Sequence, residues 1–405
     1  MRKNLPIFII ALITLSLGSS LCAQEIPESY IPVRPNAIGG AFTAIANDED
    51  AIWTNPAGIA RIRKARSRDT VSLIKIPGLV VGANTKSREF IKGVGTNSEN
   101  ADKFAAQADE LGDKPFWATT QMAPLMMLDL DDLPAILGAY STTTLQSVVN
   151  ADNNELANTQ AISDIGGIFG VAFTSKSNRF NVGLQARYLA RFAYEDKVPL
   201  TTLADGRALQ KQIKDNSNKS TALAIDMGIL WTFADFWFPT IGMSVLNAPS
   251  GCKSDYLNPF SKSRINVCGT VFKGEFANEE AISTVDPTDI RYGLSITPRF
   301  GRKLAARIAV DMHHSPIIVG DKVYGLDGID LIKQLHAGIE FFTGNPLLPS
   351  PMSFAFGLNQ GFYTAGTSVR LGALSLDFAS IGRDISSNAS PKEDRRLLGG
   401  ISLEF

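Results

Sequence analysis

The chain has 405 residues, of which 44% are hydrophobic and 20% charged, and its 39 basic side chains nearly balance its 40 acidic ones. This charge balance gives no reason to expect nucleic acid as a partner. The composition is also too polar for a bundle of membrane-spanning helices, each of which needs about 20 apolar residues. A polytopic helical membrane protein is therefore excluded.

The first residues have the composition of a secretory signal. Arg2 and Lys3 precede an apolar run that ends at Leu17, and small residues follow. The run is shorter than a spanning helix requires, so we expect a signal peptide over residues 1–23. Cleavage would leave Cys252 and Cys268, which lie in one polar segment and suggest a disulfide formed in an oxidising compartment. Two free buried thiols are the alternative.

Residues 24–69 show no strand-like alternation and form a separate N-terminal segment. A small-residue stretch over 38–46 is expected to be helical, and an acidic turn with Asp48 and Asp50 follows it. The next motif is Asn55-Pro56-Ala57-Gly58. Proline disfavours the helical region for the residue before it, and asparagine can bond the backbone in a tight turn. We expect a turn there, serving either as a structural plug or as a moving gate.

From about residue 165 onward, apolar and polar residues alternate strictly, which indicates β-strands with two different faces. These stretches suit the 9–11 residues, roughly, that cross a membrane better than the shorter strands of a soluble sandwich. We expect an all-β fold, a transmembrane antiparallel β-barrel over residues 70–405. Its fourteen strands are expected near 70–84, 116–127, 133–144, 165–175, 179–193, 219–233, 240–247, 288–298, 303–312, 333–343, 351–359, 362–371, 374–382 and 396–405.

The connections between these strands alternate between short and long, as the periplasmic turns and outer loops of bacterial barrels do. Residues 98–112 and 199–216 are expected to be helical inserts in outer loops, and 266–275 is expected to be an extended segment inside another. The chain ends on an alternating stretch with a terminal Phe405, which resembles the assembly signal of outer-membrane barrels.

The inward faces of the expected strands are rich in polar and charged groups. A lumen of this kind cannot be a continuous apolar tube, so apolar cargo would have to bind near the outer loops and leave sideways. Asp48 and Asp50 are expected to be solvated or paired, with lumen arginines such as Arg187 or Arg291 as candidate partners, and cation binding is the alternative. The expected lumen residues are Gln185, Arg187, Arg191, Asp226, Arg291, Arg307, Asp311, His336, Glu340, Arg370 and Asp377.

The phrase RPNAIGGAFTAIANDEDAIWTNPAGIARI resembles the N-terminal segment of the FadL-like superfamily of outer-membrane fatty acid transporters. Later phrases such as IDMGILWTF and LHAGIEFF resemble strands of its PorV-like and TraF-like branch. The resemblance implies that the N-terminal segment is a hatch inside a fourteen-stranded barrel. It also implies that Asn55, Pro56, Ala57 and Gly58 form the hatch turn, and that hydrophobic compounds leave through a hatch rearrangement or a lateral opening.

The expected function is therefore passive, gated uptake of small hydrophobic compounds across the bacterial outer membrane. The alternatives are an accessory barrel of secretion, conjugation or envelope assembly that binds exported proteins through its loops, and a plugged structural barrel. The expected partners are outer-membrane lipid, lipopolysaccharide, the barrel assembly machinery and a hydrophobic cargo, and we expect a monomer.

We expect neither an enzyme nor a cofactor, because the sequence holds no phosphate-binding glycine loop, nucleophile-elbow serine or zinc-protease helix. We also expect no metal site, since the pair His313-His314 has no Cys, Asp or Glu at the spacing of metal ligands.

Overall fold

The computed structural model describes residues 28–65, 71–87, 115–130, 133–150, 153–177, 179–257, 264–274, 284–301, 304–314, 317–319, 322–324, 331–344, 350–385 and 391–405. The expected signal peptide and the insert expected over 98–112 lie outside these ranges.

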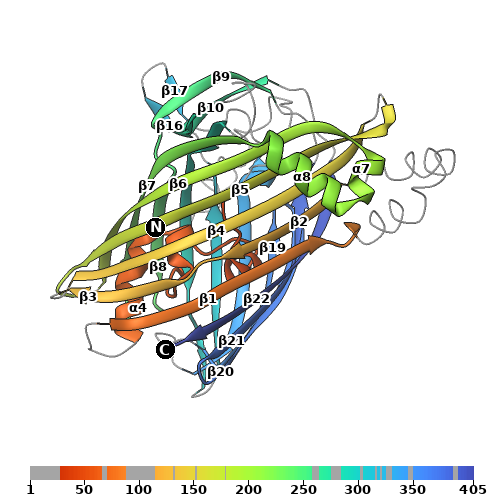
Figure 1. The fold of residues 1–405 in the computed structure, drawn as a ribbon. Coiled ribbons are helices and arrows are strands. Elements are labelled where there is room, and N and C mark those ends of the chain that lie inside the picture. Colours follow the sequence, from red (N-terminus) through yellow and green to blue (C-terminus); the bar gives the residue numbers. More distant parts are fainter. Residues whose placement is uncertain are drawn as a thin grey trace, which may run out of the picture.

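Within the described residues, fourteen antiparallel strands close into a barrel (Figure 1). Each strand pairs with the next in the chain, and the last pairs with the first. The expected fold is confirmed. The strands are β1 (Val71–Asn84), β2 with β3 (Phe116–Met122, Leu125–Leu130), β4 (Leu133–Asn150), β5 (Asn153–Thr174), β6 (Phe180–Pro199), β7 (Asn218–Thr232), β8 (Thr240–Leu246), β13 with β14 (Asp289–Ile296, Arg299–Phe300), β15 (Leu304–Met312), β18 (Leu335–Thr343), β19 (Met352–Asn359), β20 (Phe362–Leu371), β21 (Leu374–Asp384) and β22 (Glu393–Glu404).

The alternation predicted from the sequence is present: the strands have an apolar face that points outward and a second face that points into the barrel. On β7, the side chains of Leu223, Ile225 and Met227 are exposed, whereas Ala224 and Asp226 are buried inside. The same division recurs on β6 and β15. A belt of exposed apolar side chains around a closed barrel is the surface that lipid covers. The chain is therefore a transmembrane barrel of the outer-membrane type.

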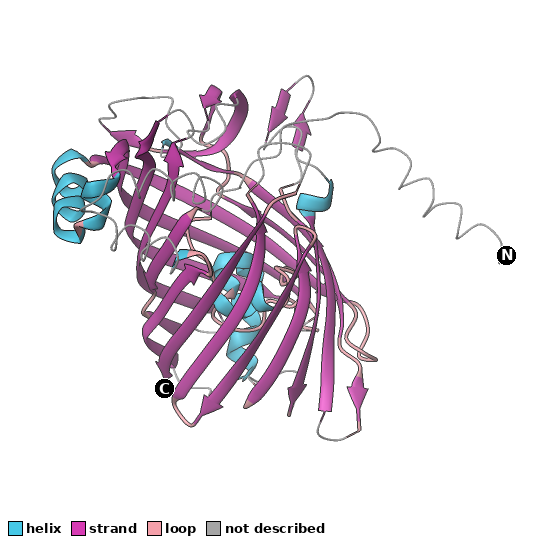
Figure 2. Ribbon diagram, turned by 90° about the vertical axis from the view of Figure 1, so that its right-hand side faces the viewer, coloured by secondary structure: helices cyan, strands magenta, loops and turns pink. Residues whose placement is uncertain are grey.

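The end of the barrel opposite the C-terminus carries additional structure (Figure 2). Helices α7 (Leu200–Ala204) and α8 (Gly206–Asn216) follow β6, and Leu209 of α8 packs against Tyr194 and Val198 of the elongated β6. A further short helix, α9 (Leu331–Gln334), precedes β18. Among the described residues, no helix is long and apolar enough to cross a membrane.

Two small sheets lie outside the barrel wall. In the first, β9 (Gly251–Leu257) pairs with β10 (Arg264–Val271), which also pairs with β12 (Val285–Pro287). A disulfide joins Cys252 to Cys268 at facing positions of β9 and β10, so the expected bond is present. The second sheet consists of β16 (Ile317–Val319) and β17 (Lys322–Tyr324). The short β11 (Lys273–Gly274) belongs instead to the barrel sheet, where it pairs with β7.

Residues 28–65, which we call the hatch, lie inside the barrel (Figure 2). The hatch contains α2 (Val33–Ala37), α3 (Ala51–Thr54), a 3₁₀ turn η1 (Pro56–Gly58) and α4 (Ile59–Ala65). The helix expected over residues 38–46 is wrong, because this stretch forms turns. Gly39 and Gly40 both have positive φ angles, of 73° and 85°, which a right-handed helix cannot contain.

Candidate functional site at the interface of hatch and barrel

The Asn55-Pro56 motif attaches the hatch to the wall. Asn55 has an extended backbone, as its position before Pro56 predicts, and its Oδ1 accepts a hydrogen bond from Ala57 N (3.1 Å). Its Nδ2 donates to the carbonyl oxygens of Thr43 (2.9 Å) and Ile229 (3.1 Å), the latter on β7. Because Asn55 is fully buried, each of these bonds satisfies a group that water cannot reach. The motif therefore joins the hatch to β7 of the wall through buried hydrogen bonds.

Among the described residues, eight inward-facing glycines of the wall, which we call the glycine ring, contact the hatch directly. A Cβ atom at any of them would lie closer than 3.0 Å to a hatch atom, a separation that real Cβ atoms essentially never show. Only glycine therefore allows the hatch to approach so closely. The ring consists of Gly170 (β5), Gly183 (β6), Gly228 (β7), Gly242 (β8), Gly293 (β13), Gly338 (β18), Gly357 (β19) and Gly366 (β20).

A chain of ion pairs joins the hatch to β15 and β18. Arg34 of α2 donates to both carboxylate oxygens of Glu340 (2.8 and 2.7 Å) and also to Asp48. Glu340 accepts a further bond from Arg307 (2.7 Å). Burial alone would lower the pKa of Arg34, but Glu340 and Asp48 outweigh it and hold that pKa well above its ordinary value. The partner of Asp48 is thus Arg34 within the hatch and not one of the expected lumen arginines.

The acidic turn of the hatch faces a small cavity at β1 and β20–β22. Glu49 pairs with Lys75 of β1 at 2.7 Å, and Asp50 lines a cavity of about 60 Å³ together with Asp377 and Arg370. Arg370 also pairs with Glu404 at 2.8 Å. Burial, and then the carboxylate of Asp48, raise the pKa of Asp50 well above its ordinary value. Asp50 is consequently a half-buried acid whose charged form this site disfavours.

The charged residues expected on β6 and β7 pair largely within the wall. Arg187 donates to both oxygens of Asp226 (2.7 and 2.9 Å), and Gln185 bonds Asp226 and the hatch carbonyl of Ile52, both at 2.9 Å. Arg191 forms a similar two-bond pair with Asp164 of β5 (2.7 and 2.6 Å). These pairs fill their side of the lumen and leave little uncompensated charge for a ligand.

On the outer side of the hatch, Asp311 and His336 hold its backbone. Asp311 accepts a bond from Thr43 N at 2.7 Å, and His336 Nδ1 lies 2.8 Å from the carbonyl oxygen of Gly39. Arg291 pairs with Asp289 at 2.6 Å rather than with a hatch acid. Every expected lumen residue therefore has a placed partner or lines a cavity.

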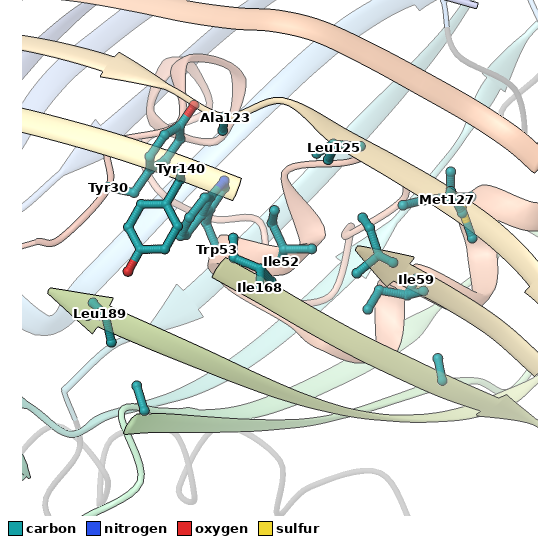
Figure 3. Packing of buried hydrophobic residues seen from close by; sticks show 14 of the residues in the cluster. Tyr30, Ile52, Trp53, Ile59, Ala123, Leu125, Met127, Tyr140, Ile168 and Leu189 are labelled. Atoms are coloured by element: carbon teal, nitrogen blue, oxygen red, sulfur yellow. The ribbon is translucent and has the colours of Figure 1, made fainter. Parts of the chain in front are cut away.

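The opposite side of the hatch is apolar. Ile52, Ile59 and Ile62 pack against inward-facing residues of β1 to β5, among them Leu125 and Ile168 (Figure 3). We call this cluster the apolar sector; besides the three isoleucines, it includes Leu73, Ala123, Leu125, Met127, Ile136 and Ile168.

The strand pairing of the wall is irregular beside the apolar sector, although Ala123 N still donates to the carbonyl oxygen of Gly78 at 3.1 Å. The pairing of β1 with β22 shifts between Ile76 and Leu79, and β2 stops at Met122 before β3 resumes at Leu125. Proline occurs on both sides of this gap, at positions 77 and 124, and cannot donate to a sheet ladder. We call residues 76–78 and 123–124 the wall break.

On the periplasmic side of the hatch, a cavity of about 330 Å³ adjoins Arg61. Arg61 donates to the carbonyl oxygens of Ala44 (3.1 Å) and Ile45 (2.9 Å) and to Thr232 Oγ1 (2.9 Å). Burial, with a smaller contribution from Arg307, lowers the pKa of Arg61 to about 10. The group remains charged at neutral pH and bridges hatch and β7.

Phe405 lies where the barrel closes. Its backbone exchanges hydrogen bonds of 2.9 and 3.0 Å with Ile74 of β1, and its side chain is exposed on the outer face.

Three functional features escaped prediction from the sequence: the glycine ring, Arg34 as the bridge to Glu340, and Asp164 as the partner of Arg191. The glycine ring does leave a signal in the sequence, because strand after strand has a glycine at an inward position. The other two depend on which strands are neighbours.

Comparison with solved structures identifies the architecture. The toluene transporter TodX of Pseudomonas putida matches with a TM-score of 0.51 at 9% sequence identity, over 94% of this chain and 99% of that chain. The chain has the fold of TodX. A deltaS2S3 mutant of the TodX monoaromatic hydrocarbon channel gives a TM-score of 0.50 at 9% identity, over 92% and 97% of the two chains.

No family model matches the sequence, and no curated protein does. The expected FadL-like architecture is confirmed by the structural match, and the PorV-like and TraF-like branch stays a prediction. The fold and the outward apolar belt together place the chain in the bacterial outer membrane.

Proposed function

We propose that the protein is a channel through which small hydrophobic compounds diffuse passively across the outer membrane, with the hatch controlling passage. The observation that carries the proposal is the apolar sector, in which Ile52, Ile59 and Ile62 of the hatch share one buried cluster with Ala123 of the wall break. The fold adds support, because TodX, which shares it, is described as a toluene transporter.

A lateral route explains how an apolar molecule could pass a lumen full of ion pairs. Moving such a molecule past Arg187, Arg191 or Glu340 would separate charges from their partners, which is costly in a buried site. The apolar sector offers contacts without that cost, and at the wall break beside it the strand register shifts and two prolines cannot donate ladder hydrogen bonds. We propose that cargo leaves there into the hydrocarbon of the membrane.

Passage by this route requires the hatch to move. Hatch isoleucines fill the apolar sector, so cargo can occupy it only if Ile52, Ile59 or Ile62 is displaced. The polar bonds of Asn55 and Arg34 oppose that displacement. The same contacts therefore set the closed state and the barrier to opening.

Whole-cell uptake tests the function. The chain is expressed in a Gram-negative host that lacks its own fatty acid channel, and uptake of labelled toluene and of labelled oleate is measured against an empty vector. We expect faster uptake of at least one compound. Uptake no faster than the vector control, with folded protein in the outer membrane, would exclude the channel and favour the accessory barrel.

An engineered disulfide tests the moving hatch. Val33 Cγ2 lies 3.3 Å from the place that a Cβ would take at Gly400 of β22, which suits a bond between cysteines at these positions. The oxidised Val33→Cys/Gly400→Cys variant should lose uptake, and reduction should restore it. The two single variants and reduced wild type are the controls. Full uptake by the cross-linked protein would mean that α2 does not move.

The lateral exit has its own matched pair of variants. Ala123 points into the apolar sector and is 3% exposed, whereas the adjacent Met122 faces lipid and is 42% exposed. Ala123→Phe should slow uptake by filling the exit, and Met122→Phe should not. Equal uptake by both variants would argue against an exit at the wall break.

A further inference from the structure

The chain contains only three histidines, and all three gather at one place inside the barrel. His313 and His314 follow β15 directly, and His336 lies near the start of the neighbouring β18. The rings of His313 and His336 are stacked with their centroids 3.9 Å apart, and those of His313 and His314 are 6.1 Å apart. All three side chains are nearly fully buried, at 4% to 5% exposure.

A carboxylate completes the group. Asp289 lies at the start of β13, the strand that pairs with β15, and one ligand atom from each of Asp289, His313 and His314 lies within 4.8 Å of the others. Arg291 holds Asp289 Oδ2 at 2.6 Å, while Asp289 Oδ1 lies 3.4 Å from His314 Nδ1. The sequence spacing could not reveal this carboxylate, because it comes from a different strand.

Asp289 accepts hydrogen bonds from Arg291 Nε (2.6 Å) and from His314 N (3.0 Å), but one nitrogen of each imidazole in this group is not satisfied. His313 Nε2, His314 Nδ1 and His336 Nε2 are buried and have no hydrogen-bond partner among the described residues. A buried imidazole nitrogen without a hydrogen-bond partner is costly, so each such nitrogen calls for a functional or structural explanation.

The tautomer of His336 follows from its other nitrogen. The carbonyl oxygen of Gly39 can only accept a hydrogen bond, so His336 Nδ1 must donate and carry the proton. The lone pair of His336 Nε2 is therefore free within the cluster. Metal-binding histidines are commonly oriented in this way by a backbone carbonyl.

We propose that His313, His314 and Asp289 bind a divalent first-row transition-metal ion. Two imidazoles and one carboxylate suit ions such as Zn²⁺ or Ni²⁺, whereas Mg²⁺ and Ca²⁺ prefer oxygen ligands throughout. His314 and Asp289 also line a cavity of about 40 Å³, which has room for a water molecule as a further ligand.

The surrounding charges are compatible with a cation. Carboxylates outnumber guanidinium groups near the histidines: Glu28, Asp289 and Asp311 face Arg291 and Arg383. Asp311 Oδ2 lies 3.6 Å from His313 Nε2 and also accepts from Thr43 N. A bound ion would thereby connect β13 with the outer end of β15, beside a cavity that Ile52 of the hatch also lines.

The experiment uses the full mature chain in detergent, purified with a tag that lacks histidine, so that every imidazole belongs to this cluster. Zn²⁺ binding is measured by isothermal titration. We expect one Zn²⁺ per chain, unaffected by excess Ca²⁺. His313→Ala, His314→Ala and Asp289→Asn should each weaken binding at least tenfold, and Asp235→Asn, an exposed acid in a periplasmic turn, should leave it unchanged.

X-ray absorption at the zinc edge of the wild-type protein provides a second measurement that needs no variant. Imidazole scattering is expected and can come only from the three clustered histidines. Two results would overturn the proposal: no stoichiometric Zn²⁺ binding by folded wild type, or a bound zinc without imidazole ligands. Variants that still migrate in the compact, heat-modifiable form and bind Zn²⁺ as wild type does would overturn it as well.

Discussion

Gly338 of β18 and Ile38 of the hatch are in direct contact: the carbonyl oxygen of Ile38 occupies the space that a Cβ at position 338 would need. The hatch is therefore fitted against the backbone of the wall and not only against its side chains. The same relation recurs around the glycine ring, which makes the position of the hatch sensitive to single methyl groups in the barrel.

Replacing Gly338 by valine should displace the hatch. The added atoms must overlap Ile38, and such overpacking typically costs about 1–3 kcal/mol. We expect faster proteolysis within residues 28–65 and a lower denaturant midpoint. Gly167→Val is the matched control, because a Cβ at Gly167 would meet only Gly138 O, at 3.9 Å. Equal effects of the two substitutions would contradict the role of the glycine ring.

Removing the Arg34 guanidinium should loosen the hatch by a different mechanism. Arg34 pairs with both Asp48 and Glu340, and Arg34→Met removes this shared partner. Breaking a buried ion pair by removing one member costs about 3–5 kcal/mol. The free energy of unfolding, from denaturant titration of the reconstituted barrel, measures the loss.

A double-mutant cycle checks that mechanism. Asp48→Asn in the Arg34→Met background removes both members of one pair, so the combined cost should be smaller than the sum of the two single costs. Strictly additive costs would show that Arg34 stabilises the hatch through something other than its ion pairs.

Neutralising Asp50 should stabilise the protein at neutral pH. The pKa of Asp50 is raised in the folded state by burial and then by Asp48, so the folded state holds this proton more tightly than the unfolded state does. Stability attributable to this group is unchanged below its unfolded pKa of about 3.8 and falls as the pH rises above it. Asp50→Asn should therefore raise the denaturant midpoint at pH 7 and have little effect at pH 3. An effect of equal size at both pH values would contradict this origin.

Loss of the disulfide should affect the small outer sheet of β9, β10 and β12 and leave the barrel intact. Cys252 and Cys268 join β9 to β10, which lie outside the closed ring of strands. In the chain-entropy model a loop of this size contributes about 3 kcal/mol. The Cys252→Ser/Cys268→Ser variant should be cleaved faster within β9 or β10 while its heat-modifiable migration on gels stays unchanged. Loss of the compact form would mean that the outer sheet supports the barrel.

Much of the barrel was predictable because one physical cause controls it. A strand between lipid and lumen must alternate, and the alternation of Leu223, Ile225 and Met227 with Ala224 and Asp226 needs no knowledge of neighbouring strands. The turn at Asn55 was predictable for a similar reason, since proline restricts the residue before it.

The contacts between strands were not predictable in this way. Arg34 and Glu340 are 306 positions apart in the chain, and their pairing depends on where α2 lies inside the closed ring. The histidine cluster with Asp289 likewise depends on the register that places Tyr292 opposite Met312. Local composition misled over residues 38–46, where glycine turns against the wall replaced the expected helix.

The backbone bonds between Ile74 and Phe405 also constrain the order of assembly. These bonds join the two ends of the strand series, so the ring cannot close until the whole chain has been made. The hatch precedes β1 in the chain and contacts strands as late as β22, so it lacks part of its binding surface until the last strand is in place. The barrel must therefore be built around its own plug, and its slowest step should be the most non-local one, closure of β22 onto β1.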